Sequence, residues 1–363
     1  MFSSVMLRVL GGVYSAAVAV IVLTICWRRH HRKAARPALI CLGHATIDTI
    51  LRVPQVKLPP VKILATACVQ TAGGMATNAA TAACRLGARV TLLSRVGSDA
   101  AGQAYLAHMA LEADLDTGHV VKIRGAKTSI SSILVDAMGE RLVVPYNDPR
   151  LADVDAARVV AGALRAGLPS ASLVDVRWPE GAEQLLHQLA VRGCRMRMLD
   201  ADVAPVEVLR RLAPLATHVI FSEPGLALFT NGLAEMGTPA GGPTQPTASS
   251  RLAQAQRALP NAAMVGVTLG AEGFVWVEVG AQQQQRVVAP TVDAEDTLGA
   301  GDVFHAALVV GLTEGLGTTR KAVQLACAAA ALKCTRFGGR LGAPTRQAAD
   351  VLARATYGHE EST

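Results

Sequence analysis

Downstream of Pro37, short apolar segments alternate with Ala-rich stretches of helical length. Short strands that are apolar on both faces are typical of a parallel sheet with helices covering each side. The pattern therefore predicts an α/β fold with a doubly wound, mostly parallel sheet flanked by helices. The strands are predicted at 38–42, 90–94, 173–176, 196–199, 218–221, 264–268 and 274–278, and the helices at 78–86, 102–112, 181–192, 206–213, 301–314 and 318–336.

Two strand-like regions interrupt this alternation because they have no helix of their own. Residues 50–69 are extended and rich in proline, and residues 129–135 and 141–145 have the pattern of a hairpin. We expect these regions, about 50–70 and 128–146, to form a small β lid over the main sheet. We also expect the chain to pair with a second copy through this lid, as a homodimer.

The amino terminus carries a separate signal. Residues 9–27 contain no charged side chain, and as a helix they would span roughly 28 Å, close to the hydrocarbon thickness of a bilayer. The basic residues that follow favour a single-pass anchor whose carboxyl side stays in the cytosol. The sequence thus predicts a membrane anchor with a basic flank in 1–36, a cytosolic domain in 37–355 and a tail in 356–363. A cleaved secretory signal, and a soluble cytoplasmic protein whose start codon is placed too far upstream, are the alternatives.

Charge and cysteine content exclude several classes of protein. The formal charge is +7, but the first 36 residues hold six Lys or Arg and no acidic residue, which leaves 29 basic and 28 acidic residues in the rest. With aromatic residues at 4%, this part has neither the charge nor the stacking groups of a nucleic-acid-binding protein. The seven cysteines form no CxxC pair, so neither a disulfide framework nor a zinc site is indicated.

Candidate chemistry is concentrated in the segment DTLGAGD, residues 296–302, which precedes a predicted helix. Gly299, Ala300 and Gly301 leave backbone amides uncovered at the positive end of the helix dipole, where an anion can bind. Asp302 then lies in the first turn beside that anion, where a carboxylate can take a proton from an attacking hydroxyl. A tight turn followed by a capping aspartate is the structural alternative for such a segment taken alone.

A second glycine-rich segment, AGGMATN at 72–78, weakens that alternative. Gly73 and Gly74 let a ligand approach the backbone, and the Asn78 amide can bond to sugar hydroxyls. The two motifs, GGxxxNxA...LG...GxDxxG and DTxGAGD, resemble the signatures of the PfkB, or ribokinase-like, carbohydrate kinases over residues 38 to about 355. The resemblance implies a ribokinase-like fold and ATP-dependent phosphorylation of a sugar hydroxyl, with Asp302 as the base and residues 299–301 as the anion hole.

The resemblance also implies roles for other residues. Asp48 matches the sugar-binding aspartate of the family and would act beside Gly73, Gly74 and Asn78. Mg²⁺ is expected to bridge the phosphates of ATP. Where many members carry NxxE for the metal, this chain has SEPG, so Glu223 would act on the metal through water. The ATP site is implied for Thr268, Gly270, Gly273, Thr297 and Gly338.

Other segments, among them DVRW at 175–178, resemble the sulfofructose kinase branch of this family. That likeness implies transfer to C1 of 6-deoxy-6-sulfofructose or a similar ketose with an anionic end, with Lys62 and Arg177 holding the anion. A buried anion needs paired cations to offset its desolvation. Where that branch places a polar amide on the hairpin, this chain has Pro145, with Asn147 two residues on. A fructokinase or ketohexokinase, a nucleoside kinase, and a membrane-bound sugar sensor without catalysis are the alternatives.

Overall fold

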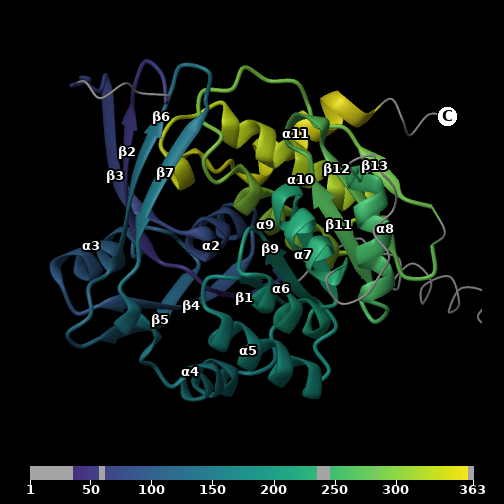
Figure 1. Cartoon of the computed structure of the whole chain (residues 1–363), viewed down its shortest axis with the longest axis horizontal. Helices are drawn as coiled ribbons and strands as arrows, with labels where there is room; N and C mark the ends of the chain where they lie inside the picture. The colour runs from purple at the N-terminus through teal and green to yellow at the C-terminus, as the bar shows by residue number, and fades with distance from the viewer. Residues whose placement is uncertain (1–35, 57–61, 235–245, 282, 359–363) are drawn as a thin grey trace, which may run out of the picture. The chain divides into compact units, whose positions relative to one another are not determined.

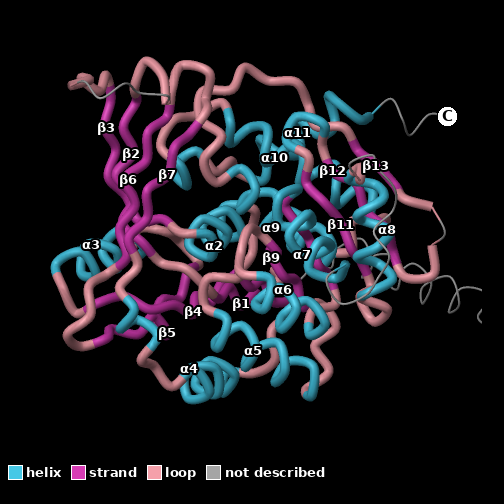
Figure 2. Tube along the Cα trace, in the orientation of Figure 1, coloured by secondary structure: helices cyan, strands magenta, loops and turns pink. Residues whose placement is uncertain are grey.

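A computed structural model describes residues 36–56, 62–234, 246–281 and 283–358 (Figure 1). Its main feature is a sheet in the order β13-β12-β11-β10-β9-β8-β1-β4-β5 (Figure 2). The strands from β11 to β5 in that order are parallel, and β12 is antiparallel to both of its neighbours. The predicted mostly parallel sheet is confirmed. Its strands are β1 (Ala38–Leu42), β4 (Arg89–Gly97), β5 (Leu115–Ile123), β8 (Ala171–Asp175), β9 (Arg197–Ala201), β10 (His218–Ser222), β11 (Met264–Thr268), β12 (Phe274–Glu278) and β13 (Gln285–Val287).

Side chains along each strand alternate between two buried layers. In β1, Leu39 and Cys41 belong to one hydrophobic cluster, whereas Ile40 and Leu42 belong to the other. This alternation explains the uninterrupted apolar sequence of the central strands. One layer contains α2 (Met75–Arg85), α3 (Ala100–Met109), α9 (Ala300–Glu314), α10 (Thr319–Cys334) and α11 (Arg346–Tyr357). The other contains α4 (Ala156–Ala163), α5 (Pro179–Val191), α6 (Val206–Leu212), α7 (Glu223–Ala234) and α8 (Ala248–Ala258).

A second sheet, in the order β3-β2-β6-β7, stands at one side of the main sheet (Figure 1). It consists of β2 (Thr46–Arg52), β3 (Ala67–Gly73), β6 (Ser129–Val135) and β7 (Arg141–Tyr146). Its buried residues Ile50, Ile133 and Val135 pack against Leu298 and Phe337, so the sheet covers the segment that leads into α9. The regions expected to form a lid thus form one sheet, but β2 begins four residues earlier than predicted because Thr46 already pairs with Gly73 and Ser129.

Several elements escaped prediction for identifiable reasons. In β5, half-buried and exposed residues alternate along most of the strand, because it is an edge strand and lacks a continuous apolar run. α7 begins with Glu-Pro-Gly, which resembles a turn, although proline is well tolerated in the first turn of a helix. α4, α8, α11 and β13 were likewise not predicted, and the helix predicted at 318–336 ends at Cys334.

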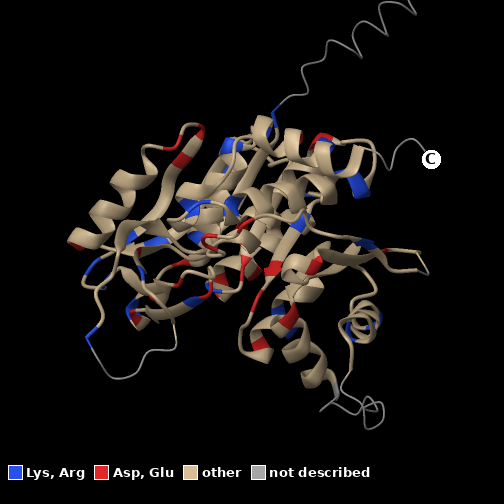
Figure 3. Cartoon of the chain, turned by 90° about the horizontal axis from the view of Figure 1, so that it is seen from above, with Lys and Arg blue, Asp and Glu red and all other residues tan. Residues whose placement is uncertain are grey.

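None of the helices within the described residues is long and apolar enough to cross a membrane. The predicted anchor, residues 9–27, lies outside the described residues. In the described part of the chain, basic and acidic residues are interspersed over the elements (Figure 3).

Candidate active site

Asp302 lies in the first turn of α9, as the sequence predicted. Gly299 precedes the helix with a φ of 79°, a left-handed conformation that glycine adopts without strain. Asp302 is 9% exposed, and its Oδ2 accepts a hydrogen bond of 2.7 Å from Asn78 Nδ2. A Cβ at position 299 would lie 3.3 Å from that amide nitrogen, so glycine also leaves room for the pair. The two glycine-rich motifs therefore meet through their side chains.

The backbone at the start of α9 is open on one side. A Cβ at Gly301 would meet no atom of the described chain within 4 Å. The amide of Ala300 donates to the carbonyl oxygen of Thr297 at 3.2 Å, so it already has a partner in the turn. A helix leaves the amides of its first turn without intrahelical acceptors, and such amides bind anions. Gly301 is also exposed, so a ligand can approach the start of α9 at this position.

Asp48 lies in β2 and faces the other glycine-rich motif. A Cβ at Gly73 would fall 1.8 Å from Asp48 Oδ2, so this carboxylate occupies the space that a side chain would need. Gly74, with a φ of 98°, directly precedes α2, which carries Asn78. Residues 73–78 thus connect the Asp48 carboxylate to the Asp302 carboxylate, and the structure brings together the four residues predicted to bind sugar in this region.

Burial is the largest influence on the pKa of Asp302 and on that of Asp48. Desolvation raises the pKa of Asp302 to about 8, repulsion from Asp200 adds to the shift, and the hydrogen bond from Asn78 opposes it. Burial also raises the pKa of Asp48 to about 7, against the hydrogen bond from Ser131 and the charge of Arg340. Carboxylates whose pKa values lie near neutrality are suited to exchanging protons with a substrate.

A third carboxylate, Asp175, organises this end of the sheet and was not predicted as a site residue. It accepts backbone hydrogen bonds from His44 at 2.8 Å, Ala76 at 3.0 Å and Arg177 at 2.8 Å. These bonds fix the loop after β1 and the start of α2 to the end of β8. A Cβ at Gly43 would lie 2.1 Å from the Asp175 carboxyl carbon, which explains the glycine. Gly43 directly follows β1 and Asp175 is the last residue of β8, and this position at strand ends is the signal that could have identified them.

Arg177, predicted to hold an anionic group, lies just beyond β8. Its guanidinium is 3.4 Å from Asp202 Oδ2, and the two side chains are 38% and 35% exposed. Burial lowers the pKa of His44 to about 4, and the charge of Arg177 contributes to the shift. His44 Nε2 also lies 2.9 Å from Asn147 Oδ1. Asn147, which follows β7, therefore reaches this region, whereas Pro145 is exposed within β7.

Two of the predicted ATP-binding residues adjoin the start of α9. Thr297 Oγ1 donates to the carbonyl oxygen of Gly139 at 2.9 Å and accepts from Arg141 at 2.8 Å, so the lid hairpin is fastened to the DTLGAGD segment. The Gly338 amide donates to Asp296 Oδ2 at 2.9 Å. The other three, Thr268, Gly270 and Gly273, follow one another at the carboxyl end of β11.

A buried ion pair between Asp296 and Lys333 holds the first residue of the DTLGAGD segment in place. Lys333 Nζ lies 3.2 Å from Asp296 Oδ2, and both side chains are 0% exposed. The same carboxylate accepts from the amides of Leu298 at 2.8 Å and Gly339 at 3.0 Å. Asp296 therefore joins the start of α9 to the loop after α10. The sequence showed Asp296 only as part of a motif, and nothing in the pattern pairs it with Lys333.

The structure places two predicted residues at the surface. Lys62 is exposed, beside residues outside the described ranges, and Glu223 is exposed at the start of α7. Within the described residues, no group of three or more His, Cys, Asp or Glu could hold a metal ion. A single accessible carboxylate does fit Mg²⁺ as it is held in nucleotide sites, where the ion keeps several waters and binds substrate phosphates.

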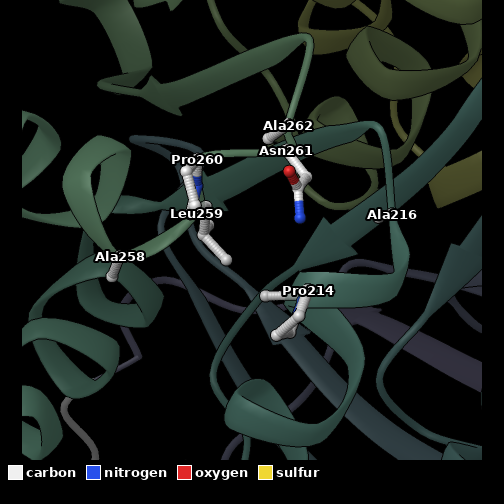
Figure 4. Close-up of a pocket in the computed structure, with 8 residues that line it drawn as sticks. Pro214, Ala216, Ala258, Leu259, Pro260, Asn261 and Ala262 are labelled. Atoms are coloured by element: carbon white, nitrogen blue, oxygen red, sulfur yellow. The ribbon is translucent and has the colours of Figure 1, made fainter.

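Figure 4 shows a hollow of about 30 Å³ between the end of α8 and the segment after α6. Ala216 and Ala262, which line it, precede β10 and β11. The hollow therefore lies at the amino ends of these strands, whereas Asp302 lies at the carboxyl ends. It is therefore not part of the candidate site.

Comparison with known proteins gives concordant matches. A family model described as pfkB family carbohydrate kinase matches residues 36–346. A ribokinase from Haemophilus influenzae is 27% identical over 326 residues, covering 86% of this chain and 97% of that protein. A solved structure from Agrobacterium tumefaciens, itself only provisionally assigned as a ribokinase, is 36% identical with a TM-score of 0.79 and covers 89% of this chain and 99% of its own. A ribokinase from Arabidopsis thaliana, solved with ribose and ATP, shares the fold with a TM-score of 0.70 at 19% identity, covering 88% of this chain and 99% of its own.

Proposed function

The chain belongs to the pfkB family of carbohydrate kinases and is a phosphotransferase that acts on a sugar hydroxyl, and on this premise we propose that it phosphorylates a ketose with an anionic end, such as 6-deoxy-6-sulfofructose, at C1. The observation that carries the catalytic part of the proposal is the buried Asp302 carboxylate, held by Asn78 at the open start of α9. Arg177 beside the Asp175 and His44 region supports the choice of an anionic sugar.

In this proposal, Asp302 acts as the general base. Its carboxylate accepts the proton of the acceptor hydroxyl while the hydroxyl oxygen attacks the γ-phosphorus of ATP. The bond from that phosphorus to the bridging oxygen breaks, and ADP leaves. Amides of the first turn of α9, which have no intrahelical acceptor, stabilise the charge on the transferring group. Bound Mg²⁺ would neutralise phosphate charge, with Glu223 as the residue assigned to hold its water shell.

Asp48, Gly73, Gly74 and Asn78 are assigned to the sugar hydroxyls. Their support is the close approach of Asp48 to Gly73 and the position of Asn78 beside the base. Arg177 and Lys62 are assigned to the anionic end. Thr268, Gly270, Gly273, Thr297 and Gly338 are assigned to ATP, because they follow the carboxyl end of β11 and adjoin the start of α9.

Ribose is the second candidate acceptor. The specific observation in its favour is that the relatives from Haemophilus influenzae and Agrobacterium tumefaciens carry the name ribokinase, in the second case provisionally. Ribose has no anionic end, so the two candidates differ in their need for Arg177.

A coupled assay of ADP release by the purified full-length protein separates these candidates. The panel contains 6-deoxy-6-sulfofructose, fructose, ribose and inosine, each with MgATP. We expect the highest kcat/KM with the sulfonated sugar, and Arg177→Ala should lower it at least about tenfold through the loss of a charge-assisted contact. Arg158→Ala, at an exposed position of α4, is the matched control. Equal turnover of ribose or fructose by wild type and Arg177→Ala, with no turnover of the sulfonated sugar, would refute the proposed substrate.

Two proposals concern the whole chain. We assign residues 1–36, with the apolar run 9–27, to a membrane anchor that leaves the kinase domain in the cytosol. We also propose a homodimer through the lid, supported by β7, an edge strand of the second sheet whose Leu142, Val143 and Val144 are 45%, 41% and 58% exposed. An exposed apolar edge strand is favourable for pairing with another chain.

A further inference from the structure

A buried carboxylate and histidine lie beside Asp302 and have no role in the function proposed above. His305 follows Asp302 by three residues on α9, so both lie on the same side of the helix. His305 Nδ1 is 3.2 Å from Asp200 Oδ2, and the two side chains are 4% and 8% exposed. Asp200 lies near the carboxyl end of β9, in register with Asp175 on β8.

The charged groups around His305 are mostly acidic. Asp175 faces this region from β8, Asp200 and Asp202 from β9 and the residues after it, and Asp302 from α9 itself. Arg177 is 3.4 Å from Asp202 and offsets the charge of that carboxylate, which leaves Asp200 and Asp302 as the buried acidic groups that raise the pKa of His305. α2 contributes the amide of Asn78 rather than a charge. His305 is thus the group that can place a positive charge between Asp200 and Asp302.

The balance of interactions favours that charge. Burial lowers the pKa of His305, but Asp200, Asp302 and Asp202 outweigh it, and the net pKa is raised. For Asp302, repulsion from Asp200 raises the pKa, and attraction to His305 lowers it. A protonated His305 therefore screens the base from Asp200.

We propose that Asp200 and His305 form a positioning pair that places a positive charge on the imidazole beside Asp302 and thereby sets the pH range over which Asp302 can accept the proton of the substrate hydroxyl. The inference rests on the proposed role of Asp302 and extends it. The transferred proton goes to the Asp302 carboxylate, and His305 keeps its own proton throughout. Neither Asp200 nor His305 contacts the reacting atoms.

The test is the pH dependence of kcat for the full-length protein with its best acceptor, in three variants. His305→Gln should move the acidic limb to higher pH by about half a unit or more, because Asp302 then faces Asp200 unscreened. Asp200→Asn should move the limb to lower pH, and the double variant should lie at or below wild type. His218→Gln, a buried histidine at the amino end of β10 that contacts Thr217, is the control and should leave the limb in place.

Shifts of the acidic limb in opposite directions for His305→Gln and Asp200→Asn distinguish the proposal from a packing role. Loss of a packing role would lower kcat without moving the limb. A limb that does not move in folded His305→Gln would overturn the proposal. If that variant fails to fold, ¹⁵N chemical shifts of the imidazoles in wild type decide: His305 should remain doubly protonated above its ordinary pKa of 6.5, and titration at or below 6.5 would also overturn it. The imidazole measurement needs no turnover, so it separates failure of this inference from failure of the proposed kinase reaction.

Discussion

At the scale of single residues, the space left by glycine decides where the carboxylates lie. Gly73→Ala would place a Cβ 1.8 Å from Asp48 Oδ2, so Asp48 must move. Because Asp48 is assigned to sugar binding, we expect KM for the sugar to rise about tenfold or more while KM for ATP changes little. Steady-state kinetics with each substrate varied in turn measures both values.

Gly162→Ala is the control for this substitution. A Cβ at position 162, within α4, would meet His119 at 3.6 Å, an ordinary contact, and alanine is favoured over glycine in a helix. Unchanged sugar KM in folded Gly73→Ala would remove Asp48 from the sugar site.

The buried charge of Asp302 has a consequence for stability. The pKa of its carboxyl is 3.8 ordinarily and about 8 in the folded chain, so between these values the folded state binds more protons than the unfolded state. Stability contributed by this group therefore falls as pH rises through that range. Asp302→Asn should consequently unfold at a higher Tm than wild type at pH 8, with a smaller difference near pH 4. Thermal unfolding followed by circular dichroism tests this, and a Tm difference independent of pH would contradict the raised pKa.

At the scale of elements, strands that are buried on both faces of the sheet were easier to predict from the sequence than strands at its edges. The central strands β10 and β11 were predicted almost to the residue because the residues between their ends are apolar or glycine. β5 and β13 lie at the edges of the sheet, where partial exposure permits polar residues and erases the pattern. β2 was predicted to start too late, since three of its first four residues, Thr46, Asp48 and Thr49, are polar.

The candidate site was predictable where its residues belong to a recognisable glycine-rich motif. The glycine-rich segments placed Asp302 and Asn78, which the structure joins by a hydrogen bond. Asp175, the pair of Asp200 with His305, and the pair of Asp296 with Lys333 depend on which strands and helices are neighbours in space. Spacing along the chain carries no record of that order, so these partners required the structure.

The ion pair between Asp296 and Lys333 anchors the start of α9. Lys333→Met would leave the Asp296 carboxylate buried without its cation, which we expect to lower the free energy of unfolding by about 3 to 5 kcal/mol. Urea denaturation measures the loss. Glu180→Gln, which removes a partly exposed pair with Arg211 at 3.3 Å, is the control and should cost at most about 1 kcal/mol. Equal effects of the two variants would show that the buried pair does not hold this segment.

At the scale of the whole molecule, the proposed membrane anchor can be tested independently of the kinase domain. If residues 9–27 span a bilayer, the full-length protein should remain in the membrane pellet after carbonate extraction, and protease added to sealed cytosol-side-out vesicles should digest the kinase domain. A variant that begins at Pro37 should appear in the supernatant. Release of the intact full-length protein by carbonate would refute the anchor and leave the account of the active site unchanged.

The central claim is that the carboxylate of Asp302 accepts the proton of the sugar hydroxyl. The most direct measurement is single-turnover transfer of the γ-phosphoryl group from ATP to the sugar by Asp302→Asn, beside Asp293→Asn as an exposed control. We predict a rate lowered by about 10² to 10⁴ in Asp302→Asn, with ATP binding within about twofold of wild type. Transfer by folded Asp302→Asn at the rate of the control would contradict the account.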